Sequence, residues 1–209
     1  MKKIGIFGGT FNPIHNGHLN IAKKIGNSLG LDVIHIIPAN VPPHKSYIPI
    51  MEGKHRYEMC RLACEGDPLF KLNDIELKKE GRSYTVDTLN EISIDYKYSK
   101  LFLILGSDSF LSITNWVGFE EITKLAVLCT TPRDIKEVAQ LNKMDQLFKS
   151  RGVETIIFDI PVIPISSTLI RKRIQNRMEI HEMVPRNVAD YIKINNLYNK
   201  IEYEDSNIK

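Results

Sequence analysis

Two histidines three positions apart, His15 and His18, are the residues of this sequence best placed to act on a phosphate group. Before them, the apolar run Ile4–Phe7 predicts a buried strand that the glycine pair Gly8-Gly9 stops. After them, apolar residues recur at helical spacing, so the histidines stand where a helix begins. A helix N-terminus behind a glycine turn offers an anion both backbone N–H groups and the positive end of the helix dipole. Each imidazole can add a ring N–H donor, so this stretch predicts a phosphate site.

Other interpretations of the same stretch stay open. The loop lacks the Lys-Ser/Thr pair of a Walker A loop, and its glycines do not spell GxGxxG. His15 and His18 could form half of a zinc site, although no third and fourth ligand with suitable spacing accompanies them. Each could also be a hydrogen-bonded histidine beside a turn, with no ligand at all.

A second polar cluster lies near the other end of the chain, where Ser166-Ser167-Thr168 opens a predicted helix. Hydroxyl groups at a helix N-terminus bind either their own backbone or an anion. Arg171 and Arg173 follow one turn inside, which favours an anion because a guanidinium can hold phosphate through two parallel hydrogen bonds. Of the two arginines, Arg173 is more typical of a solvated helix face.

Together these stretches resemble a known enzyme family. GGTFNPIHNGH resembles the T/HxGH signature of the nucleotidyltransferase superfamily, the relatives of class I aminoacyl-tRNA synthetases. About 150 positions later, ISSTLIR is similar to the ISSTxIR motif of bacterial nicotinate-nucleotide adenylyltransferases. The resemblance implies catalytic roles for His18, Thr10, His15, Lys45 and Arg171. It also implies contacts with ATP from Gly8, Gly9, Thr10, Phe11, His15, His18, Gly106, Asp108, Ile165, Ser166, Ser167 and Arg171.

The segment after the second predicted strand, Pro38 to Lys45, is similar to the NxxPPHK loop of this family. The resemblance implies that Asn40 and His44 orient nicotinate mononucleotide and that Lys45 places a cation near the reacting phosphates. Taken alone, two consecutive prolines are equally typical of a rigid surface loop.

The run Gly81–Leu89 looks like the family's PSYTxxTL, with Arg82 where the family has proline. The resemblance implies that the amide of Thr85, at the start of a helix, helps to hold the nicotinate carboxylate. Taken alone, the run predicts a helix capped by Ser83 or Thr85.

The run Gly106-Ser107-Asp108 and the single tryptophan, Trp116, are similar to the family's G-x-D…W pattern. They imply that the indole stacks on the nicotinate ring, and that Asp108 binds ribose hydroxyls or helps to place a hydrated Mg²⁺ ion. A lone tryptophan more often packs in a core, and Asp108 could instead cap the next helix. The family commonly has an arginine directly before a proline, whereas here Arg133 follows Pro132. Arg133 either reaches the adenosine end of ATP or leaves that contact missing.

The alternation of strand-like and helical patterns along the whole chain predicts the fold class. Apolar runs at 4–7, 33–37, 101–105, 126–129 and 155–158 alternate with helical patterns near 18–29, 52–65, 85–94, 109–124 and 135–149. This alternation favours an α/β, doubly wound parallel sheet, which for this family is a Rossmann-like nucleotidyltransferase fold. We expect one domain over residues 1–198 that ends in a small C-terminal helical segment, about 166–198, followed by a polar tail at 199–209.

Composition limits the classes of protein to consider. The 209 residues are 43% hydrophobic and 25% charged, and no apolar run approaches the roughly 20 residues that span a bilayer. Without a leader-like N-terminus or membrane segment, a cytoplasmic protein is expected. A net charge of +3 suits small anionic molecules and not nucleic acid. The three cysteines are consistent with reduced thiols, and Cys60 and Cys64 are expected to face the core. The sequence does not determine the oligomeric state, and a homo-oligomer is one of the open alternatives.

The reaction implied is adenylyl transfer from ATP to nicotinate mononucleotide, which gives nicotinate adenine dinucleotide and pyrophosphate in NAD synthesis. The attacking phosphate is already an anion near neutral pH, so positioning and charge neutralisation suffice, with Mg²⁺ bridging the phosphates. No side chain is expected to be a dedicated metal ligand. Alternatives are an enzyme that prefers the nicotinamide nucleotide or phosphopantetheine, a tRNA synthetase fragment, and a non-catalytic nucleotide-binding module. The phosphopantetheine substrate is disfavoured by the SYT and Trp elements, and the tRNA synthetase fragment by the lack of a KMSKS-like loop.

Overall fold

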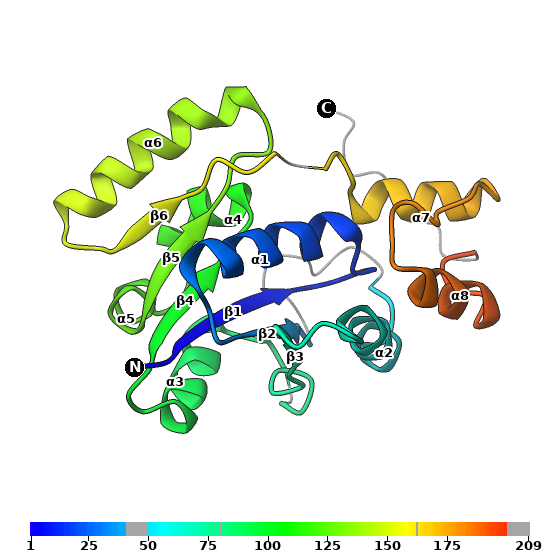
Figure 1. Cartoon of the computed structure of the whole chain (residues 1–209), viewed down its shortest axis with the longest axis horizontal. Coiled ribbons are helices and arrows are strands. Elements are labelled where there is room, and N and C mark those ends of the chain that lie inside the picture. Colours follow the sequence, from blue (N-terminus) through cyan, green and yellow to red (C-terminus); the bar gives the residue numbers. More distant parts are fainter. Residues whose placement is uncertain (41–49, 80, 162, 200–209) are drawn as a thin grey trace.

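The computed structural model describes residues 1–40, 50–79, 81–161 and 163–199. Within these ranges a single sheet of six parallel strands has the order β3-β2-β1-β4-β5-β6 (Figure 1). The strands are β1 (Lys3–Gly9), β2 (Val33–Pro38), β3 (Phe70–Leu72), β4 (Lys100–Ile104), β5 (Ala126–Thr130) and β6 (Thr155–Ile157).

Helices cover both faces of this sheet, as the doubly wound prediction requires (Figure 1). One hydrophobic cluster takes side chains from α1 (Asn16–Leu29), α2 (Gly53–Cys64), α7 (Ser167–Gln175) and α8 (Arg186–Ile194). The other takes side chains from α3 (Thr85–Asp95), α4 (Ser107–Ser112), α5 (Phe119–Leu125) and α6 (Ile135–Ser150). The predicted α/β fold with a C-terminal helical segment is therefore confirmed.

The strands are apolar on both faces because both faces are buried. In β4, Leu101 and Leu103 join the second cluster, whereas Phe102 and Ile104 join the first. Since successive side chains of a strand point to opposite faces, one continuous apolar run supplies both cores.

The structure differs from the predicted elements in three places. The strand predicted to stop at Gly8-Gly9 continues through both glycines, because β2 extends equally far and pairs with them. The three-residue edge strand β3 was missed, since so short a run shows no period. The helix predicted over 109–124 is broken into α4, a 3₁₀ turn (Ile113–Asn115) and α5. The second break falls at Gly118, whose φ of 73° is left-handed and interrupts a helix.

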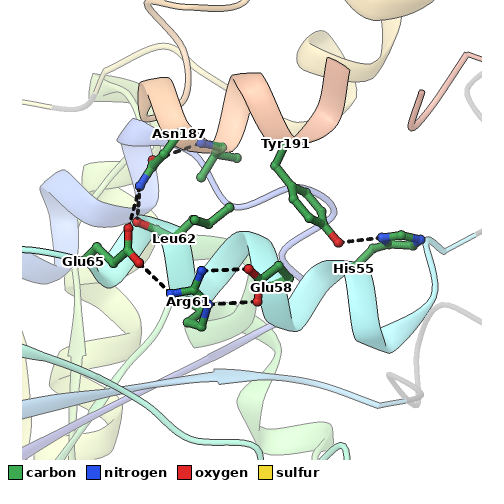
Figure 2. A network of polar contacts seen from close by, with 8 residues as sticks. His55, Glu58, Arg61, Leu62, Glu65, Asn187 and Tyr191 are labelled. Atoms are coloured by element: carbon green, nitrogen blue, oxygen red, sulfur yellow. Dashed lines mark hydrogen bonds and ion pairs between the residues drawn. The ribbon is translucent and has the colours of Figure 1, made fainter. Parts of the chain in front are cut away.

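Polar contacts hold the C-terminal helix α8 against α2 (Figure 2). The Asn187 side chain donates to the Leu62 carbonyl at 2.7 Å, and the Tyr191 hydroxyl lies 2.8 Å from His55 Nδ1. On the same face of α2, Arg61 pairs with Glu58 and Glu65. The contacts of Asn187 and Tyr191 fix α2 against the C-terminal helix, whereas the Arg61 pairs stay within α2 and its C-terminal cap. The predicted polar tail lies outside the described residues, apart from residue 199.

Candidate active site

The site is expected at the point of the sheet where the strand order reverses, so that the chain connections from two neighbouring strands run towards opposite edges. In the observed order this reversal lies between β1 and β4, which pair directly. Ligands of doubly wound sheets bind beyond the carboxyl ends of the strands at such a point. Gly8 and Gly9 end β1, and Gly106 follows β4, so the predicted ATP-contacting glycines flank the reversal.

His15 and His18 cap α1 reciprocally. The backbone N–H of His18 donates to His15 Nδ1, and the backbone N–H of His15 donates to His18 Nδ1, each over 3.3 Å. The two rings stack with centroids 3.6 Å apart and planes 20° from parallel. The edges of Phe7 and Phe11 pack around His18. The helix start predicted from the spacing is confirmed, with the histidines in the roles that serine and glutamate usually take in a capping box.

This cap determines where the ring protons lie. A backbone N–H can donate only to a ring nitrogen that carries no proton, so both Nδ1 atoms are bare and each neutral ring holds its proton on Nε2. Burial lowers the pKa of His15 from 6.5 to about 4, so that ring is neutral near pH 7. Each ring is thus poised to present an Nε2–H donor.

Gly17 allows the His15 ring to occupy its place. A Cβ atom at position 17 would lie 3.1 Å from His15 Nδ1, 3.2 Å from its Cε1 and 3.6 Å from the carbonyl oxygen of Ile163. The glycine between the two histidines is therefore needed because the first imidazole lies against its backbone.

Stability is expected to fall as the pH drops below 6.5, because two buried histidines resist protonation. The pKa of His35, like that of His15, is lowered to about 4, by burial and then by Lys71. The unfolded chain takes up these protons below its ordinary pKa of about 6.5, so each histidine removes about 2 kcal/mol of unfolding free energy by pH 5. Urea unfolding at pH 7, 6 and 5 measures this loss. Equal stability at pH 7 and 5 would contradict it, and the exposed His181→Gln should leave the dependence unchanged.

The two sequence motifs meet at the loop between β1 and α1. Arg171 Nη1 donates to the carbonyl of Asn12 at 3.0 Å, and the Ser167 hydroxyl donates to the carbonyl of Pro13 at 2.9 Å. Arg171 is only 9% exposed, and its Nη2 also reaches the Thr168 hydroxyl. Ser166 caps α7 by accepting from the Leu169 N–H, and Ile165 packs on the first core cluster. The segments predicted to share one triphosphate are therefore adjacent.

Two further residues that sequence reasoning missed hold this loop. The side chain of Arg56 is 2% exposed and donates to the carbonyls of Met51 at 2.8 Å, Thr10 at 2.9 Å, Ala39 at 2.5 Å and Asn40 at 3.2 Å. The Tyr198 hydroxyl, from the last described turn, donates to Asn12 Oδ1 at 3.1 Å. No short motif marks either residue, because each acts through contacts distant in sequence.

At the predicted mononucleotide site, Asn40 contacts the loop before α3. Its backbone N–H donates to Ser83 Oγ at 3.0 Å, and its side-chain amide donates to the Lys79 carbonyl at 2.7 Å. The predicted helix cap was wrong: the N-cap is Tyr84, without a side-chain bond, and Thr85 is the first helical residue. Ser83 is unavailable as a cap because its hydroxyl meets Asn40 instead. His44 and Lys45 lie outside the described residues.

Trp116 lies between the 3₁₀ turn and α5 and is half-buried against the second core cluster. A Cβ atom at Gly118 would lie 2.8 Å from Val86 Cγ2, so this turn packs on the first turn of α3, next to Thr85. The two residues predicted to hold the nicotinate group thus come from neighbouring segments.

Asp108 lies in the first turn of α4 and does not cap it, since the N-cap is Gly106. Its carboxylate pairs with Arg133, and both side chains are more than half exposed. Arg133 also lies 3.6 Å, at its Nη2, from a Cβ built on Gly106. Although it follows Pro132 where the family's arginine precedes the proline, Arg133 therefore reaches the end of β4.

Across the described ranges, no group of three or more His, Cys, Asp or Glu side chains could hold a metal ion.

Comparisons with known proteins agree with this architecture. Residues 6–173 match the Cytidylyltransferase-like family. A protein of Carboxydothermus hydrogenoformans named "probable nicotinate-nucleotide adenylyltransferase" is 39% identical over 197 residues, covering 94% of this chain and 98% of the relative. One of the same name from Clostridium acetobutylicum is 40% identical over 199 residues, covering 95% and 100%.

Among solved structures, the fold is similar to that of Plasmodium falciparum nicotinic acid mononucleotide adenylyltransferase in complex with NaAD. The TM-score is 0.78 at 23% identity, over 95% of this chain and 98% of that one. None of the helices in the described ranges has the length and apolar character needed to cross a membrane. With its nearly full-length match to curated relatives, the chain belongs to the nicotinate-nucleotide adenylyltransferase family of the cytidylyltransferase-like proteins.

Proposed function

We propose that this protein transfers the adenylyl group of ATP to nicotinate mononucleotide and releases pyrophosphate. A phosphate oxygen of the mononucleotide attacks the α-phosphorus of ATP and forms the new P–O–P bond. The bond from the α-phosphorus to the oxygen that bridges it to the β-phosphorus breaks, and its electron pair leaves with pyrophosphate. The products are nicotinate adenine dinucleotide and pyrophosphate.

The convergence of the two motifs on one loop is the observation that carries this proposal. The His15–His18 cap starts α1, and Arg171 bonds the carbonyl of Asn12 in the loop before it; with Thr10 of the same loop, these are the proposed donors to the triphosphate. Such preorganised donors stabilise the charge that grows on the leaving pyrophosphate. Because the nucleophile is a phosphate with a second pKa near 6, the reaction needs no side chain that abstracts a proton. Lys45 remains a proposed donor on the strength of the family resemblance alone.

Mg²⁺ enters the proposal as the partner of the ATP phosphates. The donors described at this loop are imidazole N–H groups, a guanidinium and hydroxyls, which suit phosphate oxygens and not a divalent cation. When bound, the ion would neutralise phosphate charge. Asp108, paired with Arg133, is the one carboxylate of the predicted site that could orient its water shell.

A pyrophosphate-release assay with ATP and either nicotinate or nicotinamide mononucleotide tests the proposal directly. The nicotinate form should show the higher kcat/KM, and chromatography should identify the dinucleotide product. Preference for the amide would replace the proposed substrate. Binding of ATP without turnover of either nucleotide would favour a non-catalytic module.

Trp116→Ala is expected to raise the KM for nicotinate mononucleotide about tenfold with little change in kcat, because stacking on an aromatic side chain contributes roughly 1–3 kcal/mol. Steady-state kinetics with the mononucleotide varied at saturating ATP measures this effect. Trp116→Phe, which keeps an aromatic face, should restore most of the affinity. A KM unaltered by the alanine substitution would remove the stacking role.

A further inference from the structure

The Arg56 guanidinium lies where strands β1 and β2 separate. The last backbone hydrogen bond between them runs from the Ala39 N–H to the Gly9 carbonyl, at 2.9 Å. The next carbonyl after each strand, that of Thr10 after β1 and that of Ala39 after β2, accepts a hydrogen bond from Nη1 of Arg56. The guanidinium therefore continues the connection between the two strands beyond the point where the ladder ends. It does so directly behind the loop predicted to receive the triphosphate.

The chemistry of these contacts suits an anion site. All four acceptors of Arg56 are backbone carbonyl oxygens, which carry partial negative charge and would repel a polyphosphate. Arg171 likewise donates a hydrogen bond to the backbone carbonyl of Asn12. On both sides of Phe11, a buried guanidinium thus engages a carbonyl of the loop. Arginine remains charged in proteins, so both groups also add positive potential beneath the site.

The same network extends to the mononucleotide side. Arg56 holds the carbonyl of Asn40, whose N–H donates to Ser83 Oγ. Nearby, Glu76 is a buried carboxylate that accepts from the Thr88 hydroxyl of α3 at 2.9 Å; burial raises its pKa, and Thr88 and Ser83 both act to lower it. A chain of hydrogen bonds therefore links Thr10, through Arg56 and Asn40, with Ser83, two residues before α3 begins.

We propose that Arg56 is a positioning residue for adenylyl transfer, which fixes the ATP loop at Thr10 relative to the acceptor segment at Asn40 and Ser83. The inference rests on the proposed function and deepens it. Two polyanions must be held in line for the transfer, and a misplacement of about 1 Å can lower the rate about 100-fold. A single guanidinium bonded to both loops supplies that fixed geometry without touching either substrate.

Arg56→Lys tests this role, because an ammonium keeps the charge but cannot reach four carbonyls from the planar positions of a guanidinium. We expect kcat to fall about tenfold and the KM for both ATP and the mononucleotide to rise about fivefold. Arg61→Lys is the matched control, since Arg61 lies on the same helix but pairs with Glu58 and Glu65 at the surface. Ser83→Ala cuts the network farther along, and should raise about fivefold only the KM for the mononucleotide.

The outcomes separate the inference from the function. Wild-type protein is assayed first, and failure to form the dinucleotide would count against the proposed function. If the wild type is active and folded Arg56→Lys shows KM and kcat values within twofold of Arg61→Lys, the positioning role is wrong. A merely structural role would lower the thermal midpoint while the folded fraction kept both wild-type KM values. Should Arg56→Lys fail to fold, Ser83→Ala decides, and an unchanged KM for the mononucleotide overturns the inference.

Discussion

Replacing His18 with asparagine is expected to lower kcat by about 10²–10³-fold and to leave the fold intact, the usual effect of removing one preorganised donor from a site of growing negative charge. The reason lies in the cap of α1. Asparagine places an acceptor near the position of Nδ1, so it can still accept from the His15 N–H and preserve the helix start. It has no group at the position of Nε2, so only the donor directed at phosphate is lost. Steady-state kinetics and circular dichroism of the purified variant measure the two effects.

Two further variants make this expectation specific. His18→Gln places an amide near the Nε2 position and should recover part of the lost turnover. His181→Ala removes an exposed histidine that pairs with Glu179 and should behave as wild type. Near-normal turnover of folded His18→Asn would show that the His18 ring does not assist the transfer.

Arg171→Ala is expected to lower kcat/KM for ATP by about 10²-fold, in the range found when a transition-state donor is removed. The substitution removes a buried positive charge beside the loop and leaves the Asn12 carbonyl without its guanidinium. A buried carbonyl that loses its partner is costly, so the loop between β1 and α1 should also shift. Kinetics with ATP varied, together with calorimetric titration of an ATP analogue, would measure both the rate and the affinity.

Arg173→Ala is the control for this second expectation. Arg173 lies on the same helix, and its Nε donates to the Glu179 carbonyl away from the loop. Its loss should leave kcat/KM for ATP close to the wild-type value. If folded Arg171→Ala keeps more than about a third of the wild-type kcat/KM, the arginine contributes little beyond local packing.

Local features of the sequence were sufficient to predict the parts of the site built from neighbouring residues. The strand before His15 and the helix that starts at His15 and His18 follow from hydrophobic periodicity, which acts over a few residues. The identification of ISSTLIR as their partner came from family resemblance, because no local pattern specifies which distant helix a loop will meet. The structure then places Arg171 against Asn12.

Apart from the short strand β3, the errors and omissions share one physical source, which is tertiary contact. Ser83 has the chemistry of a helix cap, but its hydroxyl is taken by Asn40. Arg56 looks like a surface residue of an ordinary helix, yet four carbonyls converge on it and make burial of its charge possible. The helix predicted through Gly118 is broken because the turn packs against Val86 of a separate helix. None of these partners is near in sequence.

The hydrogen bond from Tyr198 to Asn12 has a consequence for how the protein is made. The two residues are 186 positions apart, so the ribosome completes the β1–α1 loop long before it adds the tyrosine. A nascent chain that has emerged only as far as β6 also lacks Arg171, another partner of Asn12. The nucleotide loop therefore acquires its full set of bonds only near the end of translation, and a prematurely terminated chain contains the signature motif without a finished site.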